Sequence, residues 1–187
     1  GVLYHKNDPE LKMSLKEIAA LLGDTGGPIT GKSHINPGGQ EGSYAANIVD
    51  VKVDPETGKI EILKVTAFQD VGKAIHRAYV EGQIQGGTTQ GIGWAINEEY
   101  FMLDGQMKNN TFLDYRMPTS LDLPMIDPVV IEVFNPNHPF GVKGVGESNI
   151  VPPLGAVSDA VYNAIGKRIY DLPINPEAII RAINGKL

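Results

Sequence analysis

A glycine-rich segment with one carboxylate, residues 140–148 (FGVKGVGES), constrains the fold of this 187-residue chain more than any other feature. It follows an apolar run typical of a strand, residues 128–135, and precedes a proline-led run typical of a helix, at about residues 153–165. Glycine permits positive φ and lets another molecule approach the backbone closely. Loops held between rigid elements often carry catalytic groups. Glu147 is therefore a candidate catalytic residue, although many turns with this spacing only reverse the chain.

Sequence patterns in the rest of the chain predict short strands and helices. Ser14 and Glu17 have the spacing of a capping box, which predicts a helix at about residues 14–22. Period-2 alternation on either side of the turn at 55–59 predicts a hairpin that ends near Val65. Further predicted elements are a helix at 78–99, in which Ile92 and Trp94 are expected on buried faces, a hairpin at 100–108, a buried strand at 128–135, and helices at 153–165 and from Asn175 onward.

Strand pairs separated by helices, without a regular βαβ alternation, predict an α+β fold with mixed sheets and hairpins against packed helices. Residues 1–187 fit a single domain or a fragment of one. The sequence begins without Met, so we expect a processed product or an excised fragment.

Composition excludes several classes of function. A net charge of -6 without any run of Lys or Arg argues against nucleic-acid and anionic-membrane partners. The absence of cysteine excludes disulfides, thiolate chemistry and iron-sulfur ligation by this chain. No apolar run approaches the roughly 20 residues of a membrane-spanning helix. We therefore expect a cytoplasmic protein.

Two other kinds of site, a phosphate-binding loop and a histidine metal site, are less well supported by the sequence. Residues 26–33 match the phosphate-binding pattern G-x-x-x-x-G-K-[ST] at each fixed position. That loop needs a strand before it and a helix after it, whereas here a predicted helix precedes and Pro37 follows closely. A nucleotide hydrolase is therefore kept as a less favoured alternative. The four histidines show no metal-ligand spacing, so no metal ligands are predicted.

The helix predicted at 78–99 contains five glycines. Each glycine inside a helix costs about 0.5 to 1 kcal/mol, so their number needs an offsetting reason. Gly82, Gly86 and Gly91 recur at about one helical turn, which predicts either tight packing against another element or a smooth groove for a ligand. The spacing alone leaves both open.

Four motifs taken in order, residues 81–87 (EGQIQGG), 90–94 (QGIGW), 114–119 (DYRMPT) and 140–148, resemble the molybdenum hydroxylases of the xanthine dehydrogenase and aldehyde oxidase family. The resemblance runs from about Gly38 to the C-terminus, and the first 37 residues match less clearly. It implies the C-terminal part of a molybdopterin-binding large subunit, that is, the C-terminal half of a molybdenum-cofactor-binding domain. Such a fragment is expected to be inactive alone.

The resemblance assigns roles residue by residue. Glu147 takes the place of the family's catalytic base, and Gln83 that of a glutamine that contacts the molybdenum cofactor; Gln90 is a second candidate. The remaining expected cofactor contacts are Gly82, Gly86, Gly144, Val145 and Gly146. In this family the base deprotonates a hydroxide on molybdenum, whose oxygen then attacks an electron-poor carbon. Asp114, Tyr115, Arg116 and Pro118 also match a family signature, and we interpret Arg116 and Asp122 as residues that fix a loop.

The resemblance also implies partners. Electrons leave the molybdenum centre through 2Fe-2S clusters to FAD, which would be held by partner chains or domains, alongside an upstream molybdenum-binding segment. Purines, aldehydes, N-heterocycles, carbon monoxide and hydroxybenzoyl-CoA are distinguished largely by upstream residues, so the sequence does not identify the substrate. A non-catalytic binding or scaffolding module of the same fold is a second alternative, and a salt bridge to Glu147 would favour it.

Overall fold

The computed structural model describes residues 1–34 and 41–186, and the chain divides into two compact units, Gly1–Asn36 and Pro37–Leu187. In the first unit, strands β1 (Val2–His5) and β2 (Asp8–Ser14) form an antiparallel pair followed by helix α1 (Leu15–Leu21). The hydroxyl of Ser14 accepts a hydrogen bond from the Glu17 amide, and the Glu17 carboxylate accepts one from the Ser14 amide. The capping box and its helix are confirmed, whereas the β1–β2 pair was not predicted.

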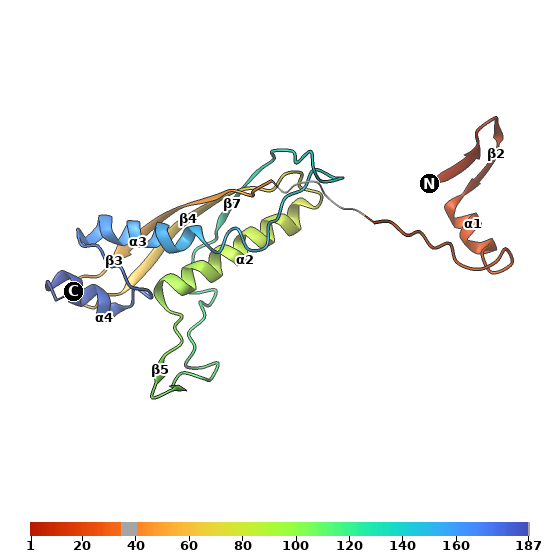
Figure 1. The fold of residues 1–187 in the computed structure, drawn as a ribbon. Helices are drawn as coiled ribbons and strands as arrows, with labels where there is room; N and C mark the ends of the chain where they lie inside the picture. The colour runs from red at the N-terminus through yellow and green to blue at the C-terminus, as the bar shows by residue number, and fades with distance from the viewer. Residues whose placement is uncertain (35–40, 187) are drawn as a thin grey trace. The chain divides into compact units, whose positions relative to one another are not determined.

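The second unit contains a three-stranded sheet in the order β3–β4–β7 (Figure 1). Strands β3 (Ala45–Val53) and β4 (Ile60–Asp70) are antiparallel, with an irregularity between Asp50 and Val51, and they confirm the predicted hairpin. Strand β7 (Asp127–Ile131) pairs with β4 in parallel. Because β4 runs past the predicted end of the hairpin to Asp70, its last residues reach the glycine-rich segment after β7.

Three helices complete the unit: α2 (Arg77–Ile96), α3 (Pro152–Ile165) and α4 (Pro176–Ile183). Helix α2 contacts β4, β7 and α3, and α3 also contacts β3, so the core lies between these two helices and the sheet. Asn175 caps α4 by accepting a hydrogen bond from the Ala178 amide at 2.9 Å, as its sequence predicts. The fully buried apolar side chains come from all of these layers: Val65, Ala67, Ile84, Ile92, Ala95, Val157 and Ile179.

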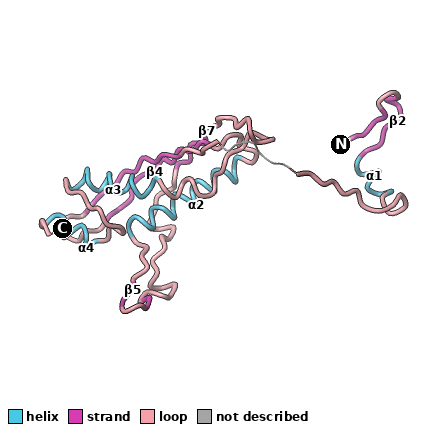
Figure 2. The backbone as a smooth tube through the Cα atoms, viewed as in Figure 1, coloured by secondary structure: helices cyan, strands magenta, loops and turns pink. Residues whose placement is uncertain are grey.

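A second hairpin, β5 (Met102–Leu103) and β6 (Gln106–Met107), follows α2 (Figure 2). Its turn places Asp104 and Gly105 at φ 50° and 73°, the left-handed conformation of the tight hairpin turn that the sequence predicts. The α+β class is thus confirmed. No helix within residues 1–34 or 41–186 has the length and apolar character to cross a membrane.

Two details of the predicted core are wrong. Trp94 is 39% exposed rather than buried, because it lies two positions from the buried Ile92 and therefore on the opposite side of the helix. The predicted buried strand at 128–135 ends at Ile131, and Phe134 beyond it is 61% exposed. Strand β7 is an edge strand with one neighbour, so its side chains are only partly covered.

Candidate functional site

The segment that carries Glu147 begins as an extension of the sheet. Gly72, just after β4, forms an antiparallel bridge with Val142, and the Lys143 amide donates to the carbonyl of Val71 at 2.9 Å. Gly72 has φ 66°, and a Cβ there would lie 2.3 Å from the carbonyl oxygen of Gly141. Only glycine allows the two backbones to approach this closely. The glycine at each side of this contact therefore fixes where the segment leaves the sheet.

A buried ion pair also holds the start of this segment against the end of β4. The Lys143 ammonium lies 2.6 Å from the Asp70 carboxylate, and the two side chains are 4% and 10% exposed. The other Asp70 oxygen accepts hydrogen bonds from the amides of Gly72 and Val133. Burial raises the pKa of Asp70, but the hydrogen bonds from Lys143 and the two amides outweigh it, so the net pKa is lowered. The hydrogen bond to Asp70 raises the pKa of Lys143.

Replacement of Lys143 by methionine is expected to destabilise this part of the fold in a pH-dependent way. Since the folded pKa of Asp70 lies below 3.8, its ordinary value, the pair stabilises the fold above that pH and the contribution is lost as pH falls further. In Lys143→Met the carboxylate is buried without its cation, so its pKa rises. Hydrogen exchange measures the free energy of opening of residues 65–73 and 140–150. Between pH 3 and 7, the loss of this free energy in Lys143→Met relative to the wild type should be largest near neutrality. A loss that does not depend on pH would contradict this explanation.

Glu147 lies in a turn at residues 146–150, directly before α3, and its side chain is exposed. The amide of Ile150 donates to the Glu147 carbonyl at 3.1 Å and closes the turn. Among residues 1–34 and 41–186, no salt bridge or side-chain hydrogen bond engages the Glu147 carboxylate. The salt bridge that would favour a scaffolding role is thus not seen in the described part of the chain.

The glycines of α2 fall into two groups. Gly87, Gly91 and Gly93 are buried packing positions: a Cβ on Gly91 would lie 2.3 Å from the carbonyl oxygen of Ile150, and one on Gly87 would lie 3.2 Å from the Cβ of Asn149. At Gly82 and Gly86 an added Cβ would meet nothing within 4 Å among the described residues. Tight packing therefore explains the first group, and the groove for a ligand stays a prediction for Gly82 and Gly86. Gly87 and Gly91 bring the 146–150 turn close to α2.

Gln83 stands between the open helix face and the turn. A Cβ on Gly146 would lie 3.5 Å from the Oε1 atom of Gln83. Within the described ranges, the Gln83 amide has no hydrogen-bond partner. Gln90 lies seven residues further along, on the same face and about 10 Å away by helix geometry. Gln83 thus presents an exposed donor and acceptor beside the backbone that carries Glu147.

The other predicted contacts lie around the same place. Gly144 is exposed, and a Cβ there would meet nothing within 4 Å among residues 1–34 and 41–186. Val145 and Gln83 share a small pocket of about 220 Å³ with Tyr79 and Val80. The structure therefore brings Glu147, Gln83 and the residues 144–146 into one region, with Gly86 one turn along the helix. No cluster of three metal-ligating side chains occurs within residues 1–34 and 41–186.

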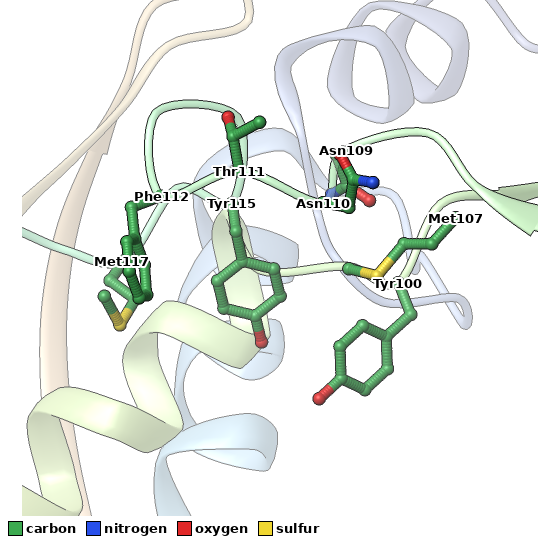
Figure 3. Close-up of a pocket in the computed structure, with 8 residues that line it drawn as sticks. All are labelled: Tyr100, Met107, Asn109, Asn110, Thr111, Phe112, Tyr115 and Met117. Atoms are coloured by element: carbon green, nitrogen blue, oxygen red, sulfur yellow. The ribbon is translucent and has the colours of Figure 1, made fainter.

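A larger pocket of about 530 Å³ lies elsewhere, beside the β5–β6 hairpin, and contains none of the predicted site residues (Figure 3). The rings of Tyr100 and Tyr115 line it, with centroids 5.7 Å apart. Burial, together with the neighbouring carboxylate of Glu98, raises the pKa of Tyr115 to about 12. Nearby, Asp122 accepts hydrogen bonds from the amide and hydroxyl of Thr119, as expected of a residue that fixes a loop.

The phosphate-loop match at residues 26–33 lacks the required context. Helix α1 precedes it instead of a strand, and residues 28–34 form no helix or strand. Residues 35–40, including Pro37, lie outside the described residues. Without a strand before the loop, its amides are not arranged to hold a phosphate chain.

Sequence reasoning missed the residues that hold the Glu147 turn in place. Gln69 and Asn149 are both fully buried, and the Asn149 amide donates to the Oε1 atom of Gln69. Asp70 and Lys143 form the ion pair described above. Neither charge is a signal by itself, because aspartate is an ordinary residue at the end of a strand. Their pairing across 73 positions of sequence has no local pattern.

The chain is similar to known proteins both in sequence and in structure. Residues 1–124 match the model of the molybdopterin cofactor-binding domain. The chain is 33% identical over 172 residues to the putative xanthine dehydrogenase molybdenum-binding subunit of Escherichia coli K12, covering 89% of this chain and 23% of that protein. It is 38% identical over 147 residues to the nicotine 6-hydroxylase large subunit of Paenarthrobacter nicotinovorans, covering 76% and 18%.

Among solved structures, quinoline 2-oxidoreductase from Pseudomonas putida 86 superposes with a TM-score of 0.68 at 38% identity, over 72% of this chain and 18% of that one. The chain thus spans less than a quarter of the length of the curated relatives described here.

Proposed function

The chain belongs to the molybdenum hydroxylase family of the xanthine dehydrogenase and aldehyde oxidase type, and we propose that it supplies the general base and one wall of the cofactor site of such an enzyme. The observation that carries the proposal is that Gln83, on α2, lies beside Gly146, the residue before the exposed Glu147. The rest of the cofactor site and most of the substrate pocket would come from other parts of the enzyme.

The residues present fit a molybdopterin cofactor. Gly82, Gly86 and Gly144 leave space that a Cβ would enter without coming within 4 Å of another residue in the described part of the chain, so packing among the described residues does not explain their lack of side chains. Gln83 offers one donor group and one acceptor, which suits both an oxo group and a pterin edge. Asn149 adds a buried Oδ1 atom that has no hydrogen-bond partner among the described residues.

Each side chain has a distinct task in the proposed reaction. When bound, the cofactor would supply the two-electron oxidant and would activate water. The substrate carbon would exchange its C–H bond for a C–O bond, with the two electrons of the C–H bond leaving to that oxidant. Glu147 would accept the proton of the water-derived oxygen at a carboxylate oxygen, and a positioned base of this kind contributes about 10²- to 10⁴-fold in rate. Gln83 orients the cofactor through its amide. The backbone of residues 144–146 permits close approach because two of the three are glycine.

The similar proteins support a proposal for the substrate class, because their names include nicotine, quinoline and xanthine. We propose oxidation of an electron-poor carbon of an N-heterocycle or an aldehyde, with oxygen taken from water. The enzyme would include an upstream molybdenum-binding segment, 2Fe-2S clusters and FAD on partner chains or domains, in the cytoplasm. Molybdenum analysis of the complete complex, followed by a screen of these substrates, tests the proposal. Molybdenum retained by the isolated chain together with hydroxylation would overturn it.

Gly86 offers a test that separates cofactor contact from folding. Gly86→Leu adds a side chain on the open face of α2 and is expected to strengthen the helix by about 0.5 to 1 kcal/mol. The proposal predicts that the complex nevertheless loses most of its molybdenum. Gly155→Leu in α3 is the matched control, because a Cβ there also meets nothing within 4 Å. Metal content per assembled complex gives the result, and full occupancy in Gly86→Leu would exclude this face as the cofactor wall.

A further inference from the structure

We propose that Gln69 is a positioning residue that sets the place of Glu147 by holding the chain on both sides of it, an inference that rests on the proposed function of Glu147 as the base. Gln69 lies near the end of β4 and is fully buried. Its amide contacts the chain three residues before Glu147 and two residues after it, at Gly144 and Asn149.

The orientation of the Gln69 amide is fixed by its partners. Its Nε2 atom donates to the carbonyl of Gly144 at 2.9 Å and to the hydroxyl oxygen of Ser43 at 3.1 Å. The Ser43 hydroxyl donates its own hydrogen to the carbonyl of Asp70 at 2.7 Å, so toward Gln69 it acts only as an acceptor. Both groups need a donor, which places Nε2 toward them. The Oε1 atom therefore faces Asn149 and accepts from its Nδ2 atom.

The contacts at Gly144 and Asn149, on either side of Glu147, thus both depend on the side chain of Gln69. Asn149 is fully buried, and its Oδ1 atom has no partner among the described residues, so its bond to Gln69 is the one that satisfies this amide. Loss of Gln69 leaves the Asn149 amide without its partner and leaves the Gly144 carbonyl with only the Ser148 hydroxyl, at 3.5 Å, among the described residues. Misplacement of a catalytic group by about 1 Å lowers rate by as much as 10²-fold.

The experiment uses the assembled enzyme with Gln69→Met and Asn149→Leu, which keep approximate shape and remove the hydrogen bonds. Each change is expected to lower kcat by about 10- to 10²-fold with KM and molybdenum content little changed. Hydrogen exchange of residues 144–151 is expected to accelerate in both. The double variant should be no slower than the worse single variant, because the two side chains act as one unit.

Gln85→Met is the matched control. It makes the same chemical change at a part-buried glutamine whose amide donates to the carbonyl of Ile126 and does not contact residues 144–150, so kcat and exchange at 144–151 should stay near the wild-type values. Unchanged kcat in Gln69→Met despite faster exchange would overturn the proposal, and so would lower kcat with exchange unchanged. If Gln69→Met fails to assemble, Asn149→Leu decides by the same two measurements. Normal turnover in Glu147→Gln would instead reject the base itself, whatever the exchange data show.

Discussion

Replacement of Glu147 by glutamine is expected to lower kcat of the assembled enzyme by about 10²- to 10⁴-fold, because the variant keeps the size of the side chain and loses its ability to accept a proton. Molybdenum content and thermal unfolding should be unaffected, since the side chain is exposed and its carboxylate makes no salt bridge within residues 1–34 and 41–186. Steady-state kinetics with metal analysis of the same preparation measures both quantities.

Glu99→Gln is a suitable control for the Glu147 experiment. It makes the same chemical change at another exposed glutamate, one located after α2 and away from the turn at residues 146–150. We expect wild-type turnover in the control. Wild-type turnover in Glu147→Gln as well would show that the base lies elsewhere, and a loss of molybdenum in Glu147→Gln would assign the residue to cofactor binding instead.

Much of the fold was predictable because its signals are local. The capping box at Ser14, the alternation in β3 and β4, and the Asn-Pro start of α4 each act within a few residues. The predictions that failed concern relations between elements. Nothing near β7 in sequence indicates that it would be an edge strand with a parallel partner, and the side of α2 that Trp94 occupies depends on where the sheet lies.

The candidate site also contains residues that the sequence predicts and residues that depend on partners far away in the sequence. Glu147 and the residues 144–146 follow from a glycine-rich loop, and Gln83 follows from a resemblance of motifs. The residues that hold them do not, because Gln69 is separated from Asn149 by 80 positions and Asp70 from Lys143 by 73. Each is an ordinary polar residue until the sheet brings its partner near. The roles of Glu147, Gln83 and the cofactor-contacting glycines stay predictions until the variants are measured.

The contact between α2 and the turn gives the second large expected effect, through Gly91→Ala. Alanine favours a helix over glycine by about 0.5 to 1 kcal/mol, so the substitution would stabilise an isolated helix. In this fold the new Cβ would lie 2.3 Å from the carbonyl oxygen of Ile150 and 2.9 Å from Pro153. The first of these neighbours is backbone and must shift. We expect a net destabilisation of about 1 to 3 kcal/mol, the usual cost of overpacking a buried site.

Gly155→Ala separates the two terms of that prediction. Gly155 lies within α3, where an added Cβ meets nothing within 4 Å, so only the helix preference acts and stability should rise by about 0.5 to 1 kcal/mol. Hydrogen exchange of α2 and α3 in the assembled enzyme measures the change in stability caused by each variant. A loss of stability in Gly91→Ala together with a gain in Gly155→Ala would assign the cost to the Gly91–Ile150 contact. Because Ile150 closes the turn on the carbonyl of Glu147, Gly91→Ala should also lower kcat, whereas Gly155→Ala should not. Stabilisation by both variants would mean that α2 and the turn are not in close contact, and the proposed site would lose its support on the helix.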